Sequence, residues 1–236
     1  MLMSFIKKIH RNRWMLRALL PSLVFNFKHL PFSQARKLPI LLYKADLRNT
    51  KGKIIISTPV RFGMIRLGVE SVSIFPNNGV MIENRGKIIF HGNTMIGNNS
   101  AISLGEKGVV EFGDNFMATT GLKLVCYDSV SFDRNVLIGW NVQIVDTDFH
   151  MLKNVNGGGK KGYGPIRVGS DVWIANGCKI YKNVTIPSLC VVGADTILHK
   201  GIKCPPYSLI TCKMETEVCT QGFYLDRNDN EIQYAE

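Results

Sequence analysis

The chain has 236 residues and is 45% hydrophobic, which is enough for one sizeable folded domain and excludes a disordered or fibrous protein. Six cysteines without a CxxC pair are too few for a disulfide scaffold and lack zinc or redox spacing, so we interpret them as reduced thiols of a cytoplasmic protein. The net charge of +11 stands out, and its position along the chain decides what it means.

The excess of positive charge lies in residues 1–53, which hold twelve Lys or Arg and one acid, Asp46, whereas residues 54–236 hold seventeen of each sign. Apolar residues recur between the basic ones at roughly helical spacing: Phe5, Ile9, Leu16, Leu19 and Leu20. This pattern predicts an amphipathic helix with two alternative roles. The helix either contacts an anionic membrane from the cytoplasmic side or caps the open end of the next domain. Because the basic residues are not spread along a groove, we expect no nucleic-acid partner.

A membrane-spanning helix is not expected in this segment. The stretch from Trp14 to Phe27 is too short to cross a bilayer and carries Arg17 and Pro21. It also lacks the small-residue cleavage pattern of a signal peptide. The sequence therefore predicts a cytoplasmic protein, with any membrane contact being peripheral.

Residues 54–212 carry a six-residue repeat. One register is aliphatic throughout: Val168, Ile174, Ile180, Ile186, Val192 and Leu198. The register four residues later holds compact side chains: Val172, Cys178, Val184, Cys190, Thr196 and Ile202. This period does not match the 3.6 residues of an α-helix, and Gly, Asn and Pro recur throughout the segment. The repeat predicts an all-β fold, a parallel β-helix with three short strands per coil, in which Cys178 and Cys190 fill the core.

The repeat continues upstream in longer coils, as the spacing of Phe90, Phe112 and Phe132 indicates. We expect the solenoid to begin near Ile54, and the one long interruption, residues 146–165, to leave it as a loop. Each coil buries a face only against the next coil, so both ends need covering. The candidates are the N-terminal segment and the tail of residues 213–236.

Several stretches resemble the hexapeptide-repeat acyltransferases. They are Asp146-Thr-Asp-Phe-His150, Gly164-Pro-Ile-Arg-Val-Gly-Ser-Asp-Val-Trp-Ile174, Val191-Val-Gly-Ala-Asp-Thr-Ile-Leu-His-Lys200 and Pro205-Pro-Tyr-Ser208. The resemblance covers roughly residues 54–212 and implies a left-handed parallel β-helix that assembles as a homotrimer, with acetyl-CoA bound between neighbouring subunits. The N-terminal segment is similar to that of acetyltransferases of bacterial capsule and surface-polysaccharide biosynthesis.

The loop contains the candidate catalytic residues. His150 has the pKa range to take a proton from a sugar hydroxyl, and loops held by a rigid scaffold commonly carry catalysis. A carboxylate bonded to its ring would fix the tautomer, and Asp146 and Asp148 are the candidates, with Asp148 favoured. If alternation continues along the strand, residues 146, 148 and 150 lie on one side. The alternatives are an ordinary surface histidine and solvated turn aspartates.

The resemblance also assigns residues to the acyl donor, acetyl-CoA. It points to Asn176, Ala194, His199 and Lys200, with Asn176 and Ala194 near the pantetheine arm and Lys200 toward the phosphates. Trp173 is a candidate wall of the site. A solvated lysine at 200 and edge packing of Trp173 are the structural alternatives. Two positions depart from the family pattern, because Ala175 replaces the usual Gly and His199 replaces a common Thr.

The expected reaction is direct O-acetylation of a sugar in surface-polysaccharide biosynthesis, with no covalent enzyme intermediate. The runner-up is N-acetylation of an amino sugar or nucleotide sugar, although residues 1–53 show no strand followed by a Gly-rich turn. A non-enzymatic β-helix scaffold would need no loop site. A zinc hydratase would need three converging histidines, and we expect no metal because the five present form no close pair: His10, His29, His91, His150 and His199.

Overall fold

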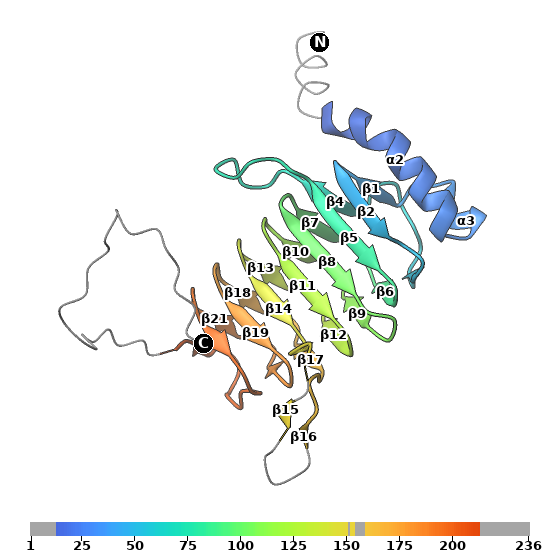
Figure 1. The fold of residues 1–236 in the computed structure, drawn as a ribbon. Helices are drawn as coiled ribbons and strands as arrows, with labels where there is room; N and C mark the ends of the chain where they lie inside the picture. The colour runs from blue at the N-terminus through green and yellow to red at the C-terminus, as the bar shows by residue number, and fades with distance from the viewer. Residues whose placement is uncertain (1–12, 151, 154–158, 213–236) are drawn as a thin grey trace, which may run out of the picture.

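A computed structural model of the chain describes residues 13–150, 152–153 and 159–212. Two helices, α2 (Arg13–His29) and α3 (Phe32–Ala35), precede a long stack of short strands (Figure 1). The expectations for Phe5, Ile9 and the tail of residues 213–236 lie outside the described residues.

The strands form three sheets, one on each face of the solenoid. The first sheet contains β1 (Ile40–Leu42), β4 (Ile65–Val69), β7 (Thr94–Gly97), β10 (Phe116–Ala118), β13 (Leu137–Ile138), β18 (Trp173–Ile174), β21 (Val191–Val192) and β23 (Leu209–Ile210). The second contains β2 (Ala45–Asn49), β5 (Val80–Asn84), β8 (Ser100–Leu104), β11 (Lys123–Cys126), β14 (Gln143–Val145), β19 (Lys179–Tyr181) and β22 (Ile197–Leu198). The third contains β3 (Lys53–Ile56), β6 (Lys87–Phe90), β9 (Val109–Phe112), β12 (Ser129–Phe132), β17 (Ile166–Val168) and β20 (Thr185–Ile186).

Each coil visits the three sheets in turn, and each strand pairs in parallel with its counterpart in the next coil. In Figure 1 the second sheet faces the viewer with its strands running to the lower right, while successive coils step to the lower left. This winding is left-handed, opposite to the usual right-handed crossover between parallel strands. The predicted left-handed parallel β-helix is therefore confirmed.

The solenoid begins at Ile40, earlier than the predicted start near Ile54. β1 and β2 form the first strands of the stack and pair with β4 and β5 of the next coil. The repeat is hidden here because all three residues of β1 are buried, whereas the middle of β2 is exposed. Neither strand therefore shows the alternation that marks the later coils.

The two predicted registers form the core. Every position of the first register is buried, and so is every position of the second except Ile202, which is partly buried near the C-terminal end of the stack. Cys178 and Cys190 point inward and are fully enclosed, as predicted.

An aromatic column fills the third-sheet side of the wider coils. The rings of Phe90 and Phe112 stack with centroids 5.4 Å apart, and those of Phe112 and Phe132 stack at 5.6 Å. Each pair occupies directly opposed positions of neighbouring strands. The spacing of these phenylalanines in the sequence, which predicts the longer coils, is thus the length of chain between stacked rings.

Asparagine and aspartate shape the corners of the coils. The backbone takes the left-handed conformation at Asn99, Asn115, Asn135, Asn141, Asp171, Asn183 and Asp195. Short polar side chains tolerate this conformation best after glycine. They also bond to one another from coil to coil, because Asn115 donates to Asn135 at 3.0 Å and Asn135 donates to Asp171 at 2.7 Å.

Helix α2 caps the N-terminal end of the stack. The Asn26 side chain donates to the Ile40 carbonyl (2.7 Å) and accepts from the Ile40 N–H (3.2 Å), while the Ser22 hydroxyl accepts from the Leu42 N–H (2.8 Å). These bonds satisfy backbone groups on the open edge of β1. The structure thus matches the capping alternative. In the part of the chain that the structure describes, no helix is both long enough and apolar enough to cross a bilayer.

Candidate active site

The loop leaves the solenoid after β14 ends at Val145 and returns at Ile166 of β17. It projects from the edge between the second and third sheets (Figure 1). Part of it forms an antiparallel hairpin of β15 (Leu152–Lys153) and β16 (Gly159–Lys160). Closer to the coil, a backbone bridge joins Thr147 to Tyr163. The loop is thus closed at its base before the chain re-enters the solenoid.

His150 is exposed just beyond this base. Its neighbour Phe149 takes a left-handed conformation (φ 59°) and donates its N–H to the Thr147 hydroxyl at 3.0 Å. The Phe149 ring packs edge-on against Tyr127, with centroids 5.5 Å apart. Solvent exposure leaves the imidazole accessible to an incoming hydroxyl group, as a general base requires.

Asp146 is buried and anchors the loop. Its carboxylate accepts the N–H of Tyr127 at 2.7 Å and that of Asp128 at 2.8 Å, and its backbone carbonyl accepts the N–H of Gly164 at 3.0 Å. Burial raises the pKa of Asp146, and the two N–H bonds partly offset that rise.

Both carboxylate oxygens of Asp146 are thus committed to the turn at Tyr127, so the residue holds the loop in place and does not orient His150. The predicted alternation of residues 146, 148 and 150 is wrong, because the strand does not continue through them. β14 ends at Val145, and beyond it Asp146 is buried whereas Asp148 and His150 are exposed.

Asp148 ties the loop to the next coil. Its carboxylate forms an ion pair with Lys182, which also donates to the carbonyl of Lys161 at 3.3 Å. Its backbone N–H donates to the Gly162 carbonyl at 2.6 Å. Lys182 therefore contacts both legs of the loop. Within the described residues neither Asp146 nor Asp148 bonds to the ring of His150.

Lys182 was not among the residues predicted from the sequence. The only indication of its role is its position in the fold. Val145 pairs with Tyr181, so the residue after Tyr181 lies beside the start of the loop. That register becomes visible only once β14 and β19 are known to be neighbours, across an interruption of about twenty residues.

The residues assigned to acetyl-CoA lie at two different edges. Asn176 and Ala194 occupy the corner between the first and second sheets on adjacent coils, where the Asp195 N–H donates to the Asn176 carbonyl at 2.9 Å. Trp173 is on β18 beside this corner and is 48% exposed.

His199 and Lys200 follow β22 at the corner between the second and third sheets, the edge from which the loop projects. Both are exposed, and the His199 ring stacks on Tyr181 with centroids 5.0 Å apart and planes at 3°. The second sheet separates this pair from Asn176 and Ala194. One solenoid therefore does not gather the five predicted residues around a single cavity.

The described residues contain no group of three His, Cys, Asp or Glu arranged to hold a metal ion. His91 lies on the third-sheet side and bonds to Ser57 and Glu111, each at 2.8 Å. His150 is on the separate loop, so the described histidines do not converge.

Known proteins are similar to part of this chain. No family model matches the sequence. The chain is 26% identical over 117 residues to an uncharacterized 24.8 kDa protein in the cps region of Klebsiella pneumoniae, covering 48% of this chain and 52% of that protein. It is 31% identical over 112 residues to galactoside O-acetyltransferase of Escherichia coli (strain K12), covering 46% and 54%. The chain thus spans about half the length of these relatives.

Among solved structures, the polySia specific acetyltransferase NeuO is similar, with a TM-score of 0.46 and 16% identity over 72% of this chain and 82% of that one. At this TM-score and identity, the similarity says nothing about the site of this chain. By its hexapeptide repeat, its left-handed β-helix and its sequence relatives, the chain resembles the hexapeptide-repeat acyltransferases.

Proposed function

We propose that this protein transfers an acetyl group from acetyl-CoA to a hydroxyl group of a sugar in surface-polysaccharide biosynthesis. The observation that carries the proposal is an exposed His150 on a loop fastened to a rigid solenoid through Asp146 and Asp148. The relative named galactoside O-acetyltransferase supports both the acetyl group and the sugar hydroxyl as reactants.

The reaction proceeds by direct transfer. His150 takes the proton of the sugar hydroxyl as that oxygen attacks the thioester carbonyl. The new C–O bond forms, the C–S bond breaks, and the departing thiolate of CoA takes the proton from the imidazolium. Burial raises the pKa of the Cys178 and Cys190 thiols, which disfavours the thiolate that an acyl-enzyme would need.

The acyl donor is proposed to lie between two subunits of a homotrimer. Asn176 and Ala194 would contact the pantetheine arm, and His199 with Lys200 would lie toward the CoA phosphates, with Trp173 as a wall. Within one chain these groups occupy separate edges of the solenoid. A site assembled from two neighbouring chains would bring them to one ligand, which favours a shared groove.

Transfer of label from acetyl-CoA tests this function. The full-length protein would be incubated with acetyl-labelled acetyl-CoA and a panel of galactosides, nucleotide sugars and lipid-linked sugars. We expect a labelled saccharide whose label is released by mild base, as an ester requires. A base-stable label would indicate N-acetylation of an amino sugar.

Failure to bind acetyl-CoA or to label any saccharide would instead favour a non-enzymatic scaffold. Sedimentation velocity on the same preparation is expected to show a trimer. A fully active monomer would contradict the shared site.

The ion pair between Asp148 and Lys182 is expected to position the loop for transfer. We expect Lys182→Met and Asp148→Asn each to lower kcat by about tenfold to a hundredfold, because each removes the contact that joins the loop to the next coil. The double variant should lose little more than either single variant, since one ion pair is removed in all three.

Lys107→Met is the control, because Lys107 is an exposed lysine that lies between β8 and β9 at the same edge of the solenoid, away from the loop. Additive losses in the double variant, or an equal loss in the control, would contradict a positioning role for the pair.

A further inference from the structure

The outer face of α2 is apolar and uncovered. The side that packs on the solenoid buries one large apolar side chain, Phe25, together with Ala18, Ser22 and Asn26. The opposite side presents large apolar residues to solvent: Leu19, Leu20, Leu23, Val24 and Phe27. An ordinary surface helix turns its apolar stripe to the core, whereas the described part of α2 exposes more large apolar side chains than it buries. A face of this kind marks a contact with another molecule.

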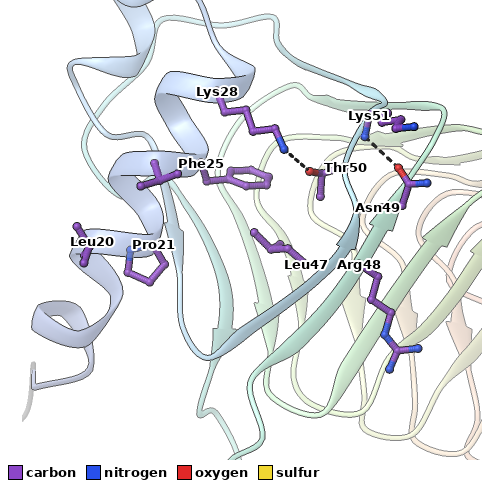
Figure 2. Close-up of a pocket in the computed structure, with 10 residues that line it drawn as sticks. Leu20, Pro21, Phe25, Lys28, Leu47, Arg48, Asn49, Thr50 and Lys51 are labelled. Atoms are coloured by element: carbon purple, nitrogen blue, oxygen red, sulfur yellow. Dashed lines mark hydrogen bonds between the residues drawn. The ribbon is translucent and has the colours of Figure 1, made fainter.

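A groove runs between α2 and β2, with a volume of about 660 Å³. Figure 2 shows Leu20, Pro21 and Phe25 on the helix and Leu47 on the facing strand. Val24 completes the apolar lining on the helix side. The volume lies in the range of small-molecule sites, and the apolar walls fit a hydrocarbon chain.

One end of the groove is basic. Lys28 donates to the Thr50 hydroxyl at 3.1 Å, and Figure 2 shows Lys28 and Lys51 at the same end. Arg48 also lines the groove, where it pairs with Asp46 at 3.0 Å. Among the described residues, no acidic side chain lines the groove, and neither Lys28 nor Lys51 has an acidic partner. The two ammonium groups are thus available to an anion.

We propose that this groove binds an anionic phospholipid of a membrane, with an acyl chain between α2 and β2 and the phosphate at Lys28 and Lys51. An apolar slot with cationic groups at one end complements an amphiphile that has a negative head group. Charge argues against a symmetric contact between two copies, because residues 1–53 hold twelve basic residues and one acid. Such a contact would bring like charges together.

The groove lies at the N-terminal end of the solenoid, on the helix side of the first coil, whereas the His150 loop leaves the stack several coils later (Figure 1). Lipid binding therefore involves none of the residues proposed for transfer. It would hold the enzyme at a membrane surface, and the two proposals fail or succeed independently.

Binding of a short-chain lipid tests the groove apart from general attraction to a charged surface. Full-length protein would be titrated with monomeric dihexanoylphosphatidylglycerol and, for comparison, with dihexanoylphosphatidylcholine. We expect at least tenfold tighter binding of the anionic lipid. Leu47→Asp and Lys51→Glu should each weaken binding of the anionic lipid by about tenfold or more, because one removes apolar lining and the other reverses a charge.

Two matched controls are available in β3. Ile55 is 40% exposed, as is Leu47, but does not line the groove, and the same holds for the exposed Lys53 in comparison with Lys51. Ile55→Asp and Lys53→Glu are expected to bind within twofold of wild type. A thermal unfolding curve would verify that each variant folds, and Val24→Asp provides a second groove variant on the opposite wall.

Equal losses in the groove variants and their controls would overturn the proposal, as would the absence of any binding of the short-chain anionic lipid. A smaller oligomer for Leu47→Asp or Val24→Asp in sedimentation velocity would also overturn it. That result would indicate that a second copy of the chain covers the face.

Discussion

Replacing His150 with alanine is expected to lower kcat by about two to four orders of magnitude, because the transition state for transfer loses its general base. Acetyl-CoA affinity and thermal stability should change little, since the side chain is exposed and lies on the loop, away from the core. Steady-state kinetics with the best acceptor, together with a direct binding measurement for acetyl-CoA, would separate these effects.

His91→Ala is the matched control. This histidine is also exposed on the surface, but it bonds to Ser57 and Glu111 on the third-sheet side and has no place in the proposed reaction. Its variant should keep wild-type turnover. If His150→Ala retained turnover within a few fold of wild type, another group would have to accept the proton.

Asp146→Ala is expected to lower the free energy of unfolding by about 2–5 kcal/mol, because it leaves the partly buried N–H groups of Tyr127 and Asp128 without their acceptor and removes a buried side chain. The loop would also lose its anchor, so turnover should fall together with stability. Urea denaturation followed by circular dichroism measures the first effect, and the transfer assay measures the second.

Asp148→Ala provides the comparison, since Asp148 is exposed and its ion pair with Lys182 is close to solvent. We expect it to cost less than about 1 kcal/mol of stability. A stability loss at Asp148 as large as that at Asp146 would contradict the assignment of Asp146 as the buried anchor.

The coils were predictable because the same burial pattern recurs in each short stretch of sequence. A position that is buried every six residues is occupied by an aliphatic residue each time. All positions of that register from Val168 to Leu198 are in the core. The column of Phe90, Phe112 and Phe132 likewise follows from residues stacked one coil apart. The sequence did not predict β1 and β2, because buried and exposed residues do not alternate along them.

The site was less predictable because its contacts depend on distances across coils. Alternation cannot be extended past Val145, where the chain turns, so the different surroundings of Asp146 and Asp148 were invisible. Lys182 joins the loop from a neighbouring coil through a register that a sequence pattern does not show. The sequence also did not predict that the apolar face of α2 points outward, because an amphipathic pattern does not show which side of a helix packs on the domain.

The closed base of the loop separates the outer part of the loop from the coils. Asp146 joins Gly164, and Thr147 bridges Tyr163, so the two legs meet before the chain re-enters the stack. Residues beyond this closure can be lengthened, shortened or exchanged without shifting the register of β14 or β17. If the loop carries the proposed acceptor site, its sequence and the repeat of the coils are then free to vary independently of each other.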